Sequence, residues 1–169
     1  MSHIWYLERW KTTLDVAKKT YRTGLRMHYE KGVHPDVCNA LSDFAMWLRW
    51  EFKFPLRVNV YVKKSRRIKA KDGDMVVGTM WKPATYDEIP YIRLATGDYE
   101  ELAEERGKKQ AIYAILLTFA HELTHYYQHI NDLDLTPRGE ERQATIYSDY
   151  ILSDYIYVSE PQEEDHSTD

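Results

Sequence analysis

The sequence predicts an α+β fold with N-terminal helices, a small three-stranded twisted sheet, a central helix and a further helix after it. Three observations predict this order. Apolar side chains recur at helical spacing up to Phe54, three short strand-like runs lie within 56–95, and helical patterns return after 110. At 169 residues, with 43% hydrophobic and 30% charged residues, the chain fits one globular domain, which we place at 1–158.

Two helices are expected in the N-terminal region. Residues 4–30 carry apolar side chains near a 3.6-residue period, which predicts one long helix. Gly32 can end that helix, and Pro35 suits the first turn of the next. The second helix carries Val37, Leu41, Phe44, Ala45 and Leu48, and Pro55 ends the helical region.

Strand patterns follow Pro55. Leu56–Val62 alternates apolar and polar residues with period two, and Met75–Trp81 and Tyr91–Ala95 also have strand-like composition. Lys71–Asp74 supplies turn residues between the first two runs. We expect Tyr91–Ala95 to be the exposed edge of the sheet, where an extended chain could be added by β-augmentation.

The segment 63–71 holds six basic residues in nine. Such a run is compatible with a phosphate-contacting arm for nucleic acid. The net charge of −4 gives no overall reason to expect an anionic partner, so the sequence favours a solvated hairpin arm.

Composition also indicates the cellular compartment in which the protein is expected. Cys38 is the single cysteine, so no intramolecular disulfide can form, and its expected role is that of a small apolar residue. The chain has no apolar run of about 18 residues and no N-terminal signal-peptide pattern. We expect a soluble cytoplasmic protein that does not associate with membranes, with a disordered acidic tail at 159–169.

The central helix, predicted over 111–130, contains the pattern His121-Glu122-Leu123-Thr124-His125. Residues four apart lie on one helical face, so the two imidazoles can ligate one tetrahedral Zn²⁺. Glu122 lies beside this pair and can act as a general base without ligating the metal. The preceding half of the helix, 111–120, is almost wholly apolar, which buries it in the core.

A hydrolytic zinc site usually has three protein ligands and one open position. The last helix, expected from Pro137 to Val158, can fold back after a break at 131–134 and present Glu141 to the metal. Glu140 points about 100° away from Glu141, and His129, on the same straight helix as His125, tends to point past the ion. The sequence favours Glu141 but leaves these two alternatives open.

The run His121-Glu-Leu-Thr-His-Tyr-Tyr-Gln-His129, followed by Glu141-Arg-Gln-Ala144, resembles the minimal gluzincin metallopeptidases of the ImmA/IrrE type from bacteria and mobile elements. The resemblance spans roughly 35–155 and implies a zincin-like fold with the third ligand, Glu141, on the helix after the motif. The chain departs from the family at Thr145, where an Asp or Asn is usual. A hydrogen-bonding partner for a zinc histidine would then be missing or come from Asp149.

Together these residues predict a zinc-dependent peptidase acting on a cytoplasmic protein, such as the repressors that the resemblance implies. Glu122 would serve as general base and then general acid. The oxyanion donor is unassigned; the candidates are Tyr147, Tyr150, Tyr155, His129 and Arg142. Two alternatives stay open: a nucleic-acid-associated protein that uses 63–71 as its arm, and a non-catalytic scaffold that binds metal or a partner.

Overall fold

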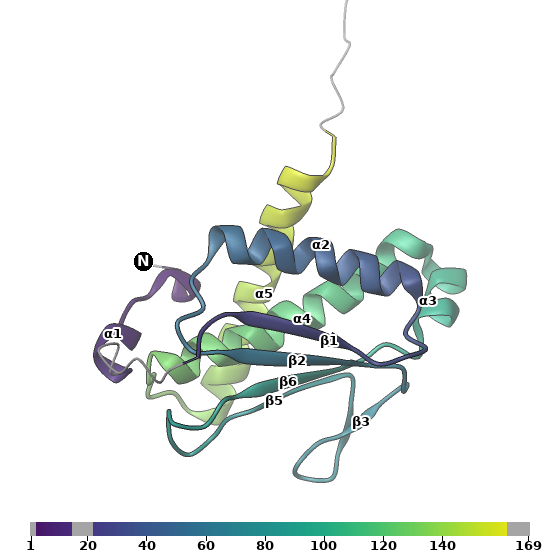
Figure 1. Ribbon diagram of the computed structural model, residues 1–169. Coiled ribbons are helices and arrows are strands. Elements are labelled where there is room, and N and C mark those ends of the chain that lie inside the picture. The colour runs from purple at the N-terminus through teal and green to yellow at the C-terminus, as the bar shows by residue number, and fades with distance from the viewer. Residues whose placement is uncertain (1–2, 15–21, 162–169) are drawn as a thin grey trace, which may run out of the picture.

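The computed structural model describes residues 3–14 and 22–161, and shows a mixed α+β fold built on a four-stranded sheet (Figure 1). The elements in chain order are η1 (Ile4–Tyr6), α1 (Trp10–Thr13), β1 (Leu25–Tyr29), α2 (Pro35–Glu51), β2 (Val58–Lys63), β3 (Ile68–Lys69), β4 (Met75–Val76), β5 (Gly78–Trp81), β6 (Tyr91–Ala95), α3 (Tyr99–Arg106), α4 (Lys108–Ile130) and α5 (Pro137–Ser159). The strand order is β1-β2-β6-β5, and β3 pairs with β4 in a separate hairpin. β1, β2 and β6 run parallel, whereas β5 is antiparallel to β6 and forms an edge.

The core lies between this sheet and the helices on one of its faces. α4 packs on β5 and β6 and α2 packs on β1, while α5 runs along α4 (Figure 1). Alternate residues of β2 (Val58, Val60 and Val62) and of β6 (Ile92 and Leu94) are buried on this face. The alternation follows from strand geometry, in which successive side chains point to opposite faces.

The prediction of one helix over 4–30 is wrong. The described part of this region forms two short helical turns, η1 and α1, and then a strand, β1; residues 15–21 lie outside the described part. Gly24, with φ of +97°, precedes the strand and adopts a backbone conformation that a helix does not contain. Leu25 is buried, and β1 gains a full ladder of parallel pairing with β2, which overrides the local helical pattern.

The strand predictions are correct in place but not in number. The run expected at 56–62 forms β2, and Tyr91–Ala95 forms β6 as expected. The run Met75–Trp81 divides into β4 and β5 at Val77, whose carbonyl oxygen accepts a hydrogen bond from Ala95 N at 2.8 Å. With β1 added, the main sheet has four strands rather than three. Tyr91–Ala95 is not an edge, because β6 lies between β2 and β5.

The predicted turn at Lys71–Asp74 connects β3 to β4, with Gly73 N donating to Ala70 O and Ala70 N donating to Asp74 O. The charged stretch before the motif helix is more helical than expected, since it forms α3 before a break at Gly107.

The last helix begins as predicted, with Pro137 in its first turn and the Thr136 side chain accepting from Gly139 N. Most of the tail expected at 159–169 lies outside the described residues, which end at Pro161. Throughout 3–14 and 22–161, every helix is too short or too polar to span a lipid bilayer.

Candidate metal centre

Helix α4 is held in one rotational setting by buried hydrogen bonds on the faces away from the two motif histidines. Trp5 Nε1 donates to Thr124 Oγ1 at 3.0 Å, and Tyr126 Oη donates to the carbonyl oxygen of Leu56 at 2.6 Å. Thr124 and Tyr126 are both fully buried. Rotating the helix would break these bonds and leave buried polar groups without partners, which costs about 1–3 kcal/mol for each group. The direction in which His121 and His125 point is therefore fixed.

His121, His125 and Glu141 converge on one point. His121 Nε2 lies 3.0 Å from Glu141 Oε2, and His125 Nε2 lies 3.1 Å from Glu141 Oε1. The donor atoms of the three residues all lie within 4.8 Å of one another. Among the described residues, these three form the one group of His, Cys, Asp or Glu side chains that could hold a metal ion. The structure thus brings together the two histidines and the glutamate that the sequence favoured.

This donor set fits Zn²⁺. Two imidazole nitrogens and one carboxylate oxygen leave one tetrahedral position open, as catalytic zinc sites require. With bonds of about 2.0–2.1 Å, donors at tetrahedral corners lie about 3.3 Å apart, close to the two distances to Glu141. Burial, together with the neighbouring His125, lowers the pKa of His121, which favours the neutral ring that can ligate a metal.

Gln128 orients His125, a role that the sequence reasoning missed. The Gln128 amide nitrogen donates to Glu140 O at 3.0 Å and to Gln143 Oε1 at 3.0 Å. Its oxygen therefore faces His125 Nδ1, at 2.7 Å, and accepts a hydrogen bond from it. With the proton on Nδ1, the lone pair of Nε2 is directed toward Glu141 and the metal position. The signal in the sequence is the i, i+3 spacing of Gln128 from His125 on one helix.

We expect Gln128→Leu to weaken Zn²⁺ binding about 10- to 100-fold, because it removes the acceptor that sets the His125 tautomer. Leucine suits the site, since Gln128 is 4% exposed. Competition with a chromophoric chelator measures the affinity. Gln143→Leu is the matched control, because it leaves the Gln128 oxygen on His125 and should cost less. Equal zinc affinity in wild type and Gln128→Leu would contradict this role.

Glu122 is buried beside the three donors, at 8% exposure, and faces a cavity of about 360 Å³ that His121 also lines. No hydrogen bond to its carboxylate is present within 3–14 and 22–161. Burial, and secondarily the charge of Glu141, raises the pKa of Glu122 to about 8. Glu122 is thus a carboxylate held without a protein partner in a water-accessible cavity.

Gly78 of β5 lets the sheet approach Glu122 closely. A Cβ at this position would lie 2.6 Å from Thr118 Cγ2 and 3.3 Å from Glu122 Oε1. Any larger residue would therefore displace β5 from α4 or move the Glu122 carboxylate. The role of Gly78 cannot be predicted from the sequence, because only the pairing of distant segments reveals this contact.

The raised pKa of Glu122 predicts a pH-dependent stability of the metal-free protein. Between pH 4.5 and about 8, the folded state keeps the Glu122 proton that the unfolded state has lost. The folded state then binds more protons, so the free energy of unfolding falls as pH rises through this window. Relative to Glu122→Gln, we expect metal-free wild type to lose up to about 4 kcal/mol between pH 5 and pH 8. Denaturant unfolding at both pH values tests this, and parallel losses in the two proteins would contradict it.

The alternative third ligands lie elsewhere. His129 is 5% exposed, with its ring 4.9 Å from that of Tyr86 and its Nε2 without a partner among the described residues. Burial, and secondarily Lys82, lowers its pKa to about 4. Glu140 adjoins the site but its carboxylate points to Lys82, at 3.9 Å. Neither residue joins the three converging donors.

The oxyanion candidates from the sequence also lie mostly away from the site. Tyr147 and Tyr150 pack with His3, and Tyr155 packs on Phe44. Arg142 is exposed on α5. Thr145 and Asp149 line the same cavity as His121, and the role of Asp149 as a partner for a zinc histidine stays a prediction.

Comparison with protein-family models, with curated proteins and with solved structures finds no match to this chain. The side chains of the site and the strands that border it are therefore the basis on which function is inferred.

Proposed function

We propose that this protein is a zinc-dependent peptidase of the gluzincin type, with a zincin-like arrangement of α4, α5 and the sheet. His121, His125 and Glu141 would hold the metal, and Glu122 would be the catalytic base. One observation carries the proposal: the buried carboxylate of Glu122, without a hydrogen-bond partner among the described residues, adjoins three metal-donor side chains and faces a cavity that His121 also lines. A scaffold that only binds metal would not need such a carboxylate.

When bound, Zn²⁺ supplies Lewis-acid polarisation of the scissile carbonyl and lowers the pKa of water at the open position. Glu122 accepts the proton of the attacking water and later delivers it to the leaving amine. The raised pKa of Glu122 suits both transfers, because a group that titrates near the working pH can accept a proton and release it again. Gln128 keeps His125 in the tautomer that leaves Nε2 free to ligate.

The substrate backbone would lie along β5, which is the free edge of the sheet next to the site. Gly78 lines the cavity with Glu122, and Met80 lines a second hollow with His125. An extended peptide added to this edge would pass both Glu122 and His125 while its main chain pairs with β5. This assignment replaces Tyr91–Ala95, which is interior to the sheet.

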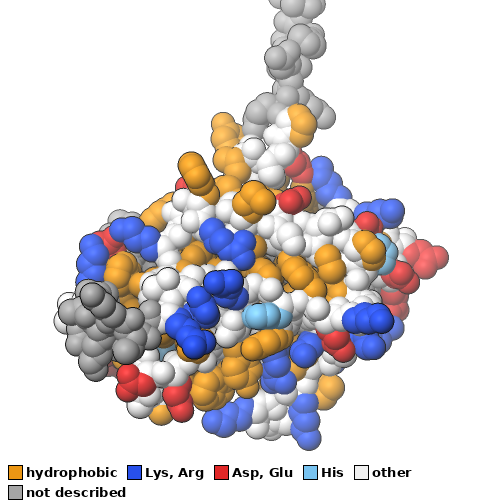
Figure 2. All heavy atoms as spheres, viewed as in Figure 1, with side chains coloured by type: hydrophobic (Ala, Val, Ile, Leu, Met, Phe, Trp, Pro, Cys, Tyr) orange, Lys and Arg blue, Asp and Glu red, His pale blue; other side chains and the backbone are white. Residues whose placement is uncertain are grey.

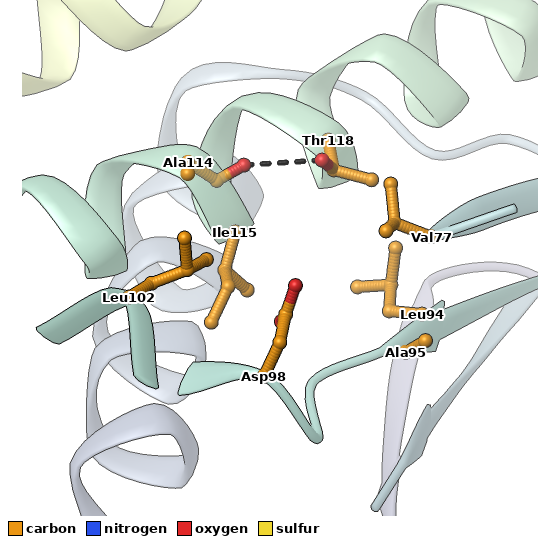
Figure 3. A pocket seen from close by; sticks show the side chains of 8 residues that line it. All are labelled: Val77, Leu94, Ala95, Asp98, Leu102, Ala114, Ile115 and Thr118. Carbon is orange, nitrogen blue, oxygen red and sulfur yellow. Dashed lines mark hydrogen bonds between the residues drawn. The ribbon is translucent and has the colours of Figure 1, made fainter. Parts of the chain in front are cut away.

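A small side-chain pocket adjoins this path (Figure 3). Its volume is about 90 Å³, and Val77 and Thr118 line both this pocket and the cavity of Glu122. The close-up shows the apolar side chains of Leu94, Leu102 and Ile115 around the hollow, with the Asp98 carboxylate pointing up among them. Arg67 Nη1 lies 3.2 Å from Asp98 Oδ2 and offsets that charge. The pocket suits a small apolar substrate side chain near the scissile bond.

Cleavage of a degenerate peptide library tests the proposal. We expect the zinc-loaded protein to cut peptides that carry a small apolar residue at one fixed position relative to the new termini. A chelator should abolish the cleavage and added Zn²⁺ should restore it, with products identified by mass spectrometry. Fully zinc-loaded protein that cuts neither the library nor proteins of a cytoplasmic extract would contradict the peptidase function.

A further inference from the structure

A row of four aromatic rings crosses the face of the sheet opposite α2 and α4. Each strand contributes one ring: His28 from β1, Tyr61 from β2, Tyr91 from β6 and Trp81 from β5. Neighbouring ring centroids lie 5.0, 6.0 and 5.3 Å apart in that order. The strand register creates the row, because Tyr61 is adjacent to His28, and Tyr91 to Trp81, across the ladders.

Cations border one end of this row. A hollow of about 520 Å³ lies between the β3–β4 hairpin and the strands β5 and β6, and Trp81 and Tyr91 line it. Its four charged lining residues, Lys69, Lys71, Lys82 and Arg93, are all basic, although Lys82 Nζ also lies 3.9 Å from Glu140 Oε1. Farther along, Lys63 Nζ lies 5.8 Å from the centre of the Tyr61 ring.

The basic segment 63–71 divides into two parts in the structure. Arg66 pairs with Glu101, and Arg67 pairs with Asp98, so both have acidic partners. Lys69 and Lys71 are exposed, and within 3–14 and 22–161 neither has an acidic partner within 4 Å. Their charge is therefore available to a ligand in the hollow.

The charge of this face differs from that of the whole chain. Figure 2 shows basic side chains around hydrophobic and histidine side chains at the lower centre of the view, over the strands and the hairpin. The chain as a whole carries a net charge of −4. Local clusters of this kind raise the concentration of anions at a surface whatever the net charge.

We propose that this sheet face binds single-stranded nucleic acid, with phosphates on the cations of the hollow and bases stacked on the aromatic row. Rings presented beside a basic groove are the combination by which such strands are bound without sequence readout. An acidic peptide would use the cations but would gain little from four rings. A duplex keeps its bases stacked inside and cannot use the rings.

The aromatic row and the candidate metal centre lie on opposite faces of β5, and no metal-donor residue lines the basic hollow. Gly78 lines the cavity of Glu122, whereas Trp81 packs on Tyr91 on the opposite face of the sheet. Met80 and Lys82 border hollows on both sides of this edge. Single-stranded nucleic acid should therefore bind without zinc and also when Glu122 is replaced. This independence separates the failure of one proposal from the failure of the other.

Fluorescence anisotropy with a labelled oligothymidine of about 12 nucleotides tests the proposal. We expect binding whose log affinity falls with log salt at a slope of about −3, as for four phosphate contacts on a single strand. An abasic strand of equal length and charge should bind about tenfold more weakly or worse, because it cannot stack. Equal binding of the abasic strand, or tighter binding of polyglutamate, would overturn the proposal in favour of an acidic protein partner. No binding at low salt would overturn it outright.

Two variants locate the surface. Lys69→Ala combined with Lys71→Ala, both exposed and on the hairpin, should reduce the salt slope to about −1.5. Arg106→Ala combined with Lys108→Ala removes the same charge at the α3–α4 junction and should leave the affinity unchanged. Trp81→Leu should lower affinity for oligothymidine but not for the abasic strand, with folding checked by circular dichroism. If the two double variants weaken binding equally, the proposed surface is wrong.

Discussion

Glu122→Gln is expected to lower kcat/KM about 10²- to 10⁴-fold on any peptide that the zinc-loaded protein cleaves, because it removes the general base. Glutamine has nearly the same shape as glutamate, and Glu122 lies in a packed position against Gly78. The variant should therefore fold and should keep its zinc, since Glu122 is not one of the three converging donors. Measurement needs initial rates on a cleaved library peptide together with the zinc content of both proteins.

Glu140→Gln is the matched control, because it removes one carboxylate near the site without touching the cavity of Glu122. Its kcat/KM should stay within a few-fold of wild type. If Glu122→Gln cleaves as fast as wild type, then Glu122 is not the base and the non-catalytic scaffold becomes the better account. If Glu122→Gln loses its metal, Glu122 is a metal ligand and its assignment as the general base is wrong.

His121→Ala and His125→Ala are each expected to weaken zinc binding by more than the roughly 100-fold that loss of a supporting hydrogen bond costs. Glu141→Ala should have a comparable effect, since its two oxygens lie 3.0 and 3.1 Å from the two imidazoles. Titration against a competing chelator measures each affinity. Glu140→Ala and His129→Ala are the matched controls, and both should leave the zinc affinity nearly unchanged. Loss of binding in either of these, with Glu141→Ala unaffected, would show that the third ligand is misassigned.

Local patterns in the sequence were sufficient to predict α2, α4, α5, β2 and β6. These elements have strong short-range signals, such as Pro35 and Pro137 at helix starts and the apolar half of α4. The juxtaposition of His121, His125 and Glu141 was also predictable. The two histidines share one face of α4, and Glu141 lies near the start of α5, which follows α4 after a short connection.

The rest depended on contacts between distant segments. The local pattern predicts helix for β1, because its five residues become a strand only through parallel pairing with β2. The edge position of β5, the approach of Gly78 to Glu122 and the aromatic row on the open face all follow from strand order and register. Sequence periodicity contains neither of these quantities.

The zinc content of the purified protein tests the central claim most directly. Elemental analysis of wild type, expressed without added metal, should find close to one zinc per chain, and His121→Ala should retain almost none. Wild-type protein that contains no zinc, and that binds none when Zn²⁺ is added, would contradict the metal centre and with it the proposed peptidase.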